Sequence, residues 1–367
     1  MQIAELRVYV ATKDLAGKVW NPKIRWLEKH SVFVEVQSDD GLVGLGEAWC
    51  FDRSPEPLVA FLASEVAPRL QGLEADPDLV ARLLNDTTSL SARHGIMASA
   101  LSAVDIALWD LAAQARGLPL WRHLGGSRGE APVYASGGLY GLNKTAERLA
   151  EELAGYIARG FRAVKMKVGA LPPEEDATRV RKVREVLGPE TDLLIDGVYS
   201  LTPAGARQFW DLVSPCRIAA FQSPIPADDF DGMAALTAAG LPLMGLEAEY
   251  RPDLVRHLVE RPAVAILQLA LVACGGISAA RRFIALAGAR GLPCSLEVSS
   301  SAVAELAALH LAAAHAQVIS VEMHQVHDLL FDLVPSLAAP RPPGFVRLPD
   351  APGLGMTLPG ERATRRL

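Results

Sequence analysis

Cysteine is scarce in this sequence, and neither sign of charge dominates it. The 367 residues carry a net charge of −6, and 21% of them are charged. This balance gives no sign of a basic surface for nucleic acid or for an anionic membrane. No Cys-x-x-Cys pair is present, so buried small side chains are favoured over disulfides or metal ligands at the four cysteines, Cys50, Cys216, Cys274 and Cys294.

Signals for targeting to a membrane are also missing. The first ten residues, MQIAELRVYV, alternate as a strand does and do not form a basic segment followed by an apolar one. We find no apolar run that is long enough to span a bilayer. These absences predict a cytoplasmic protein with no membrane partner and no nucleic-acid partner.

The first part of the chain predicts a small α+β domain. Alternating runs over residues 3–10 and 31–49 indicate antiparallel strands, and an Asp-Asp-Gly turn interrupts the second run. Helical spacing follows over residues 54–72 and 99–119. We expect this domain to end near residue 125.

From about residue 131 the sequence repeats strand, loop and helix. Eight apolar runs read as strands, at residues 132–137, 163–168, 193–197, 218–223, 243–247, 265–270, 294–298 and 318–323. The residues at the ends of runs two to eight are 23 to 29 positions apart, the length of one strand, one helix and two loops. This rhythm predicts an α/β fold of the (β/α)8 TIM-barrel type, in which the strand ends meet at one mouth.

Two lysines of the run AVKMKV raise a question about that mouth. Lys165 and Lys167 are two residues apart, so they share one face of a strand that otherwise reads as buried. Three later strands end in oxygen-bearing side chains, Asp196, Gln222 and Glu247. A hard cation such as Mg²⁺ prefers oxygen ligands, although strand-end capping is an equally open interpretation.

A lysine beside another cation loses its proton more easily, because like charge disfavours the protonated form. A neutral lysine opposite a metal that holds a carboxylate is suited to remove the α-proton. The cation would then stabilise the enediolate. The strand ends therefore suggest proton abstraction next to a carboxylate.

Several segments together resemble the mandelate racemase and muconate lactonizing enzyme branch of the enolase superfamily. They are GLVGLGEAW, SAVDIALWDLAAQARGLPLWRHLGG, VKMKVG, LLIDG, GGIS and the PGLG of residues 352–355. The resemblance implies a modified barrel covered by a capping domain that both termini build. We expect a capping domain at 1–125, a barrel at 126–335 and a C-terminal segment at 336–367 that returns to the cap. A homo-oligomer is also implied.

The resemblance assigns a divalent metal, Mg²⁺ or another, to Asp196, Gln222 and Glu247. Gln222 stands where the family usually has the Glu of a Glu-x-Pro motif, so the ligands carry one negative charge fewer and we expect weak binding. Val198 replaces a usual Asn.

In the mandelate racemase pattern Lys167 would be the base and Lys165 would neutralise the substrate carboxylate. The usual second bases are missing, since strand six ends in Ala270 and strand seven carries Glu297. Glu297 is interpreted either as an acid with a raised pKa or as an ion-pair partner of the lysines. Glu322 matches a residue that contacts the substrate carboxylate, and a buried salt bridge is its other interpretation.

Two weaker signals lie in loops. The segment 11–31 occupies the place of the family's specificity loop, and either binds an acidic substrate or is a solvated loop; its candidates are Lys18, Trp20, Lys23, Arg25, Trp26 and Lys29. His324 and His327 follow strand eight three positions apart. Polar loop histidines are favoured over metal ligands there, because no third His or Cys ligand is evident.

Three hypotheses follow from these residues. The first is a lyase in which one lysine base abstracts the α-proton of a small carboxylate, most simply to dehydrate an acid sugar or related hydroxy acid. The second is a racemase or cycloisomerase with a rearranged second base. The third is a divergent homologue that binds an acid without turnover.

Overall fold

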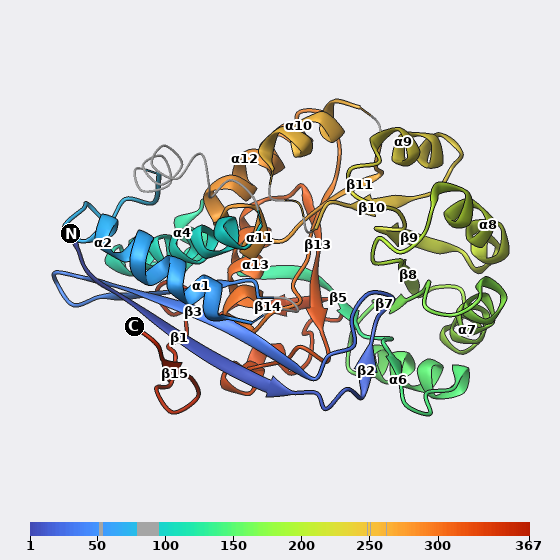
Figure 1. Ribbon diagram of the computed structural model, residues 1–367, viewed down its shortest axis with the longest axis horizontal. Coiled ribbons are helices and arrows are strands. Elements are labelled where there is room, and N and C mark those ends of the chain that lie inside the picture. The colour runs from blue at the N-terminus through green and yellow to red at the C-terminus, as the bar shows by residue number, and fades with distance from the viewer. Residues whose placement is uncertain (51–53, 79–94, 248, 250, 262) are drawn as a thin grey trace.

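Two sheets organise the chain, one in a capping domain and one in a barrel (Figure 1). The computed structural model describes residues 1–50, 54–78, 95–247, 249, 251–261 and 263–367. Both termini lie on the capping domain (Figure 1), and the C-terminal strand β15 (Thr364–Arg365) pairs with β1 (Ile3–Asp14). The last residues of the chain thus complete the sheet that the first residues begin.

The capping sheet has the order β15-β1-β3-β4, with β3 at Glu28–Ser38 and β4 at Val43–Ala48. Helix α4 (Ile96–Ala115) packs directly on β4. A Cβ atom at Gly44 or Gly46 would lie 2.0 Å from a carbonyl oxygen of α4, so both positions require glycine. Within residues 54–78, which the structure describes, the chain forms three short helical segments: α1 (Glu56–Phe61), the π-helical η1 (Leu62–Val66) and α2 (Ala67–Leu70).

Helix α4 is long and apolar enough to cross a membrane, contrary to our expectation that no such run exists. Within its most apolar window, however, 78% of the residues are buried inside the protein. Asp105 of this helix accepts a hydrogen bond from the backbone N–H of Ser278 in the barrel, and Asp110 accepts one from that of Leu354. These contacts identify α4 as the core helix of the interface between cap and barrel.

The barrel contains the eight parallel strands that the sequence predicts. They are β5 (Glu130–Ser136), β7 (Ala163–Lys167), β8 (Asp192–Asp196), β9 (Ile218–Gln222), β10 (Leu243–Gly245), β11 (Ile266–Leu269), β12 (Cys294–Leu296) and β13 (Val318–His324). Each strand pairs with the next, and β13 pairs with β5 to close the ring. The predicted fold class is therefore confirmed, while the exact boundaries at residues 125 and 335 stay predictions.

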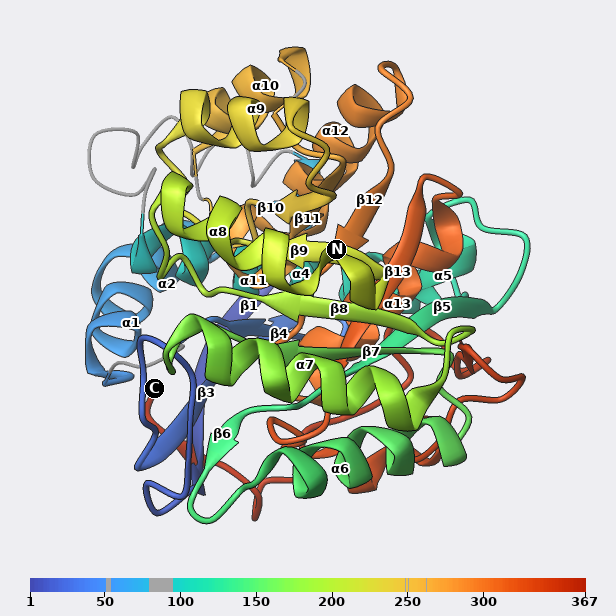
Figure 2. The same cartoon turned by 90° about the vertical axis from the view of Figure 1, so that its right-hand side faces the viewer.

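Helices cover the outside of the barrel, and Figure 2 shows α6, α7, α8 and α9 along one side of it. The helices from the end of the cap onward are α5 (Leu120–His123), α6 (Ala146–Ala158), α7 (Pro173–Leu187), α8 (Pro203–Val213), α9 (Phe230–Ala238), α10 (Pro252–Glu260), α11 (Leu271–Cys274), α12 (Gly276–Gly288) and α13 (Ala302–Ala314), with 3-10 turns η2 (Ser214–Cys216), η3 (Phe331–Leu333) and η4 (Pro335–Leu337). Two further short strands pair with each other, β2 (Val19–Trp20) and β6 (Tyr140–Gly141), and β14 (Phe345–Arg347) pairs antiparallel with β5.

One carboxylate of the capping domain caps the N-terminus of a barrel helix. Glu47 on β4 is 1% exposed and accepts hydrogen bonds from the backbone N–H groups of Ser301 and Ala304, each at 3.1 Å. The Ser301 hydroxyl donates to the same carboxylate at 2.6 Å. These N–H groups at the start of α13 have no partner within the helix, so Glu47 satisfies them from outside.

Candidate active site

The two lysines of β7 point into the barrel mouth, as their spacing predicts. Lys165 is fully buried and Lys167 is 8% exposed. Lys165 pairs in register with Leu194, and Lys167 pairs with Asp196. Strand alternation turns Val164 and Met166 to the opposite face, where they join the core beneath the outer helices. Both ammonium groups thus lie inside the ring of strand ends.

Lys165 is held by a set of oxygen atoms around its ammonium group. Its Nζ donates to Gln222 Oε1 at 2.6 Å and to Glu322 Oε2 at 2.8 Å. Asp196 Oδ2 lies 3.5 Å away, and the ring centroid of Tyr134 lies 5.5 Å away. Lys165 and Glu322 are therefore packed behind the site, where each neutralises the other.

Lys167 forms its ion pair with Asp196. Burial acts to lower the pKa of Lys167, but the charges of Asp196 and Glu322 outweigh it and raise that pKa above its usual value. Our expectation that Lys165 would lower this pKa is wrong for the structure as it stands, because the nearest charge is a carboxylate. Lys167 is thus a protonated lysine until that carboxylate is engaged elsewhere.

The three oxygen-bearing residues proposed as metal ligands do come together. Asp196, Gln222 and Glu247 line one cavity. Burial raises the pKa of Glu247, and the charge of Asp196 raises it further, so the two carboxylates are close enough to repel each other. Glu247 Oε2 accepts a hydrogen bond from the Ser223 hydroxyl at 2.5 Å. Two carboxylates and an amide oxygen are a donor set that a hard cation fits.

The described residues contain no cluster of three His, Cys, Asp or Glu side chains suited to a metal. Gln222 supplies an amide oxygen where the family pattern has a third carboxylate. Its oxygen accepts a hydrogen bond from Lys165, whereas a carboxylate there would form an ion pair with it.

Backbone strain accompanies the ends of these three strands. Val198, Tyr199, Ser223 and Leu246 have φ values of +47°, +55°, +41° and +88°. Such values are uncommon for residues other than glycine and are most costly for a β-branched side chain. The N–H of Val198 donates to Asp196 Oδ1 at 2.9 Å, so one strained turn helps to orient a predicted metal ligand.

A cavity of about 240 Å³ unites most of the predicted site. Barrel residues line it together with residues from the cap, and the predicted residues among them are Lys167, Asp196, Gln222, Glu247 and Glu297. From the loop between β1 and β3 come Lys23 and Trp26. The cap loop therefore covers the mouth of the barrel, where the sequence predicted a specificity loop.

Glu297 and Lys29 form an unusual pair of titrating groups beside this cavity. Burial, followed by the charge of Glu322, raises the pKa of Glu297 to about 8. Burial lowers the pKa of Lys29 to about 8, against the opposing charge of Glu297. Lys29 on β3 donates to the carbonyl of Ser299, so the cap places a cation next to the loop after β12. Lys29 is thus no solvated loop residue, since it is 5% exposed.

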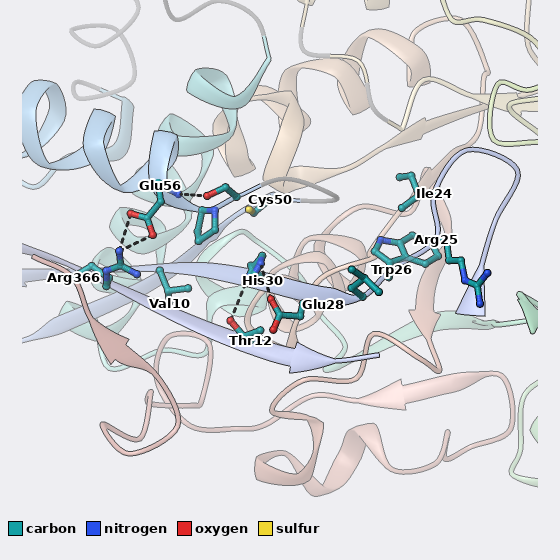
Figure 3. Close-up of a pocket in the computed structure, with 13 residues that line it drawn as sticks. Val10, Thr12, Ile24, Arg25, Trp26, Glu28, His30, Cys50, Glu56 and Arg366 are labelled. Atoms are coloured by element: carbon teal, nitrogen blue, oxygen red, sulfur yellow. Dashed lines mark hydrogen bonds and ion pairs between the residues drawn. The ribbon is translucent and has the colours of Figure 1, made fainter. Parts of the chain in front are cut away.

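A second cavity, of about 560 Å³, lies on the cap beside the first (Figure 3). Trp26 and Ile24 line both cavities and form the wall between them. In Figure 3 the ion pair between Glu56 and Arg366 lies at the end away from Trp26, with N–O distances of 2.6 and 2.7 Å. Trp26 thus separates the barrel site from an outer hollow.

His324 and His327 also line the barrel cavity, and both are 2% exposed. The sequence interpretation of polar loop histidines missed this placement. A signal existed in the chain, because His324 is the last residue of a barrel strand and His327 follows three positions later, which places both near the catalytic end of the barrel. The groups that contact His327, however, come from distant segments of the chain, namely Trp26 and the carbonyl of Ser299.

Comparison with known proteins identifies the chain. Residues 148–363 match the enolase C-terminal domain-like family, and residues 25–125 match the N-terminal domain of mandelate racemase and muconate lactonizing enzyme. This chain belongs to the mandelate racemase and muconate lactonizing enzyme family. The N-terminal match lies in the capping domain, and the C-terminal match includes the barrel strands from β7 to β13.

Individual members of this family are similar to this chain over nearly their whole length. Arabinonate dehydratase of Saccharolobus solfataricus is 30% identical over 91% of this chain and 91% of its own. D-Galactarolactone cycloisomerase of Agrobacterium fabrum is 28% identical, over 98% and 97%. A racemase from Streptomyces coelicolor A3(2), solved with bound magnesium, has a TM-score of 0.90 and 26% identity over 98% of both chains.

Enolase-superfamily relatives of this chain are dehydratases, cycloisomerases and epimerases. The chain is thus an enzyme of a family whose members include lyases and isomerases. The roles that we assign to individual side chains, Lys165, Lys167, Glu297 and Glu322 among them, stay predictions.

Proposed function

We propose that this protein dehydrates an acid sugar or a related hydroxy acid, beginning with abstraction of the proton next to the carboxylate. The observation that supports this most directly is the convergence of Lys167, Glu297 and three oxygen ligands on one cavity. Elimination needs one base and one acid, and this site offers one candidate for each. The similarity to an arabinonate dehydratase adds support for the substrate class.

Asp196, Gln222 and Glu247 would hold a divalent cation, because their oxygens share the cavity and their donor chemistry suits Mg²⁺. When bound, the cation supplies the positive charge that stabilises an enediolate. The remaining steps fall to the side chains of the chain itself. We expect binding to be weak because Gln222 contributes no charge.

Lys167 is the proposed base. Its Nζ takes the α-proton once the lysine is neutral, and the bonding pair left on carbon becomes part of the enediolate. Before a cation engages Asp196, the ion pair with this carboxylate holds Lys167 in place, and the buried Lys165 contributes positive charge on the same face of β7. Lys165 would act on the substrate carboxylate through the field of the site, since it is packed against Gln222 and Glu322.

Glu297 is the proposed acid. With its pKa raised to about 8, the carboxyl is protonated at neutral pH. Cleavage of the bond between the β-carbon and oxygen sends that proton to the departing hydroxyl, which leaves as water. Among the described residues Glu297 Oε2 has no hydrogen-bond partner, so a substrate hydroxyl would be its first.

A cycloisomerase or racemase is the second candidate. The 28% identity to a D-galactarolactone cycloisomerase over nearly the whole chain favours it. It would need a rearranged second base, because the residue that follows strand six (β11) is Ala270. Glu297 is the first candidate for that base.

The test is a screen of acid sugars and hydroxy acids with Mg²⁺ in deuterated water, followed by NMR for exchange at the α-carbon and for product. We expect exchange with at least one acid and loss of exchange in Lys167→Ala, while calorimetry still detects binding of that acid. Binding without exchange in the wild type would instead support an acid-binding homologue.

A further inference from the structure

Two histidines, one at the end of β13 and one in the loop that follows it, form part of the cavity wall. The rings of His324 and His327 stack at 4.0 Å between centroids with 10° between their planes. Trp26 packs edge-on against His327 at 5.1 Å. Lys13 of the cap donates to the carbonyl of Val326 at 2.8 Å and so holds the loop between the two histidines. The position of both rings is therefore set by contacts from barrel and cap.

The hydrogen bonds decide which nitrogen of each ring carries the hydrogen. His327 Nδ1 lies 3.3 Å from the carbonyl oxygen of Ser299, which can only accept, so Nδ1 is the donor. His324 Nδ1 lies 3.2 Å from the backbone N–H groups of Val326 and His327, so it is the acceptor and the neutral ring carries its hydrogen on Nε2.

His327 Nε2 is consequently a lone-pair acceptor. Within the residues that the structure describes it has no hydrogen-bond partner, although the ring is buried. Burial lowers the pKa of His327 well below its usual range, and the neighbouring His324 ring and the Lys29 ammonium group lower it further. The ring therefore stays neutral, and its acceptor remains available at neutral pH.

A buried acceptor without a partner favours any ligand that brings a donor. Donors in small acids are hydroxyl, amide and ammonium groups. Lys29 and Lys167 make the surroundings of both histidines positive, which disfavours an ammonium group. A hydroxyl fits the proposed hydroxy-acid substrate directly, whereas an amide N–H belongs to peptide substrates.

We propose that His327 Nε2 accepts a hydrogen bond from a hydroxyl of the substrate and so selects polyhydroxy acids over acids that lack this hydroxyl. The inference rests on the proposed function, because it places a hydroxy acid in this cavity. It adds a specificity-determining residue on the loop after strand eight. A site that hydrogen-bonds a substrate hydroxyl rejects the analogue without it, because its own polar group is then left unpaired.

The test measures binding rather than turnover. Calorimetry with Mg²⁺ present first ranks pentonates and hexonates, arabinonate included, on the wild-type protein. The tightest ligand is then compared with each of its monodeoxy analogues. We expect one analogue to bind about 10- to 100-fold more weakly.

In His327→Phe this discrimination should fall to within about threefold, because a phenyl ring has no acceptor. His327→Gln supplies an amide oxygen as acceptor and should retain part of the discrimination. This variant also tests the inference if the Phe variant does not fold. His257→Phe, on α10, is the matched control and should discriminate as the wild type does, because His257 lies against Phe230 outside this cavity.

A merely structural role for His327 would weaken the ligand and all its analogues alike and leave their ratio unchanged. That outcome, or the failure of every polyhydroxy acid to bind the wild type, overturns the inference. Discrimination that depends on His327 without any α-exchange would leave the inference standing and refute the proposed dehydration. Exchange at the α-carbon together with unchanged discrimination in His327→Phe would support the proposed chemistry and overturn the inference about His327.

Discussion

Lys165 donates a hydrogen bond to Gln222 across 2.6 Å, and both side chains are buried. In this pair an amide oxygen faces an ammonium group at the place where the family usually has a carboxylate. The exchange removes one negative charge from the proposed metal site and leaves the geometry of an oxygen donor. The affinity for a divalent metal should therefore depend on the side chain at position 222.

We expect wild-type protein to bind Mg²⁺ weakly and Gln222→Glu to bind it about tenfold or more tightly, because the variant adds a third carboxylate. Calorimetric titration of both proteins provides the measurement. Gln222→Ala serves as the control and should bind less tightly than the wild type. Tighter binding by the wild type than by Gln222→Glu would contradict the proposed ligand set.

The one-base mechanism makes a stereochemical prediction. Since Ala270 offers no base opposite Lys167, a proton removed by Lys167 should return from the side it left. A bound acid in deuterated water should therefore incorporate α-deuterium with retention of configuration. Chiral analysis of the recovered acid measures this. Inversion at a rate close to that of exchange would reveal a second base and remove the one-base interpretation.

Glu297 predicts how activity depends on pH. Because the pKa of this carboxyl is raised to about 8, its acidic form is lost as the pH rises through that value. Turnover should fall there, and Glu297→Gln should be slower by about 100-fold or more and lack this decline. Lys29 titrates in the same range, so only the Glu297 variant separates the two groups. An unchanged alkaline decline in Glu297→Gln would rule out Glu297 as its source.

The free energy of unfolding should also depend on the ionisation of Glu297. The Glu297 carboxyl ionises near pH 4.5 when unfolded and near 8 when folded, so folding takes up a proton between these values. Its contribution to stability is fully present below pH 4.5 and is lost as the pH rises through about 8. Denaturant unfolding of wild type and Glu297→Gln across this range measures the difference. If the two proteins change in parallel, the raised pKa is wrong.

Strain at Val198 can be tested through unfolding. Val198 has a φ of +47°, which a β-branched residue adopts only at a cost of about 1–3 kcal/mol. Asn tolerates this region, so Val198→Asn should raise the free energy of unfolding by about 1 kcal/mol. Val186→Asn, on the exposed face of α7, is the control and should not stabilise. Equal effects of both changes would show that strain is not relieved at 198.

We propose a homo-oligomer, as family resemblance suggests. Light scattering should give a mass that is a multiple of the 39.2 kDa chain. A mass equal to that of one chain across a wide range of concentration would refute this prediction.

The barrel could be predicted because its signal is local and repeated. Each strand is a short apolar run, and the regular spacing from Lys167 to Glu322 reports one strand and one helix at a time. The same regularity placed Asp196, Gln222 and Glu247 at one mouth. Pattern and spacing were therefore sufficient to predict the fold and the residues that gather in the candidate site.

Electrostatics within the site could not be predicted in the same way. The spacing of Lys165 and Lys167 suggested mutual repulsion, whereas the register between β7 and β8 pairs Lys167 with Asp196 and raises its pKa. The contribution of Lys29 and the tautomer of His327 both depend on the carbonyl of Ser299. Three segments far apart in the chain meet at that atom, and no local pattern encodes such a meeting.

The contact of Glu47 with the first turn of α13 has a consequence for how the molecule can be divided. A barrel produced without its cap would expose three donors, from Ser301 and Ala304, that the cap carboxylate otherwise satisfies. Cap and barrel should therefore melt in a single cooperative transition. Exchange of specificity between relatives is then best sought by replacing the loop over residues 15–27, which leaves β4 and this junction intact.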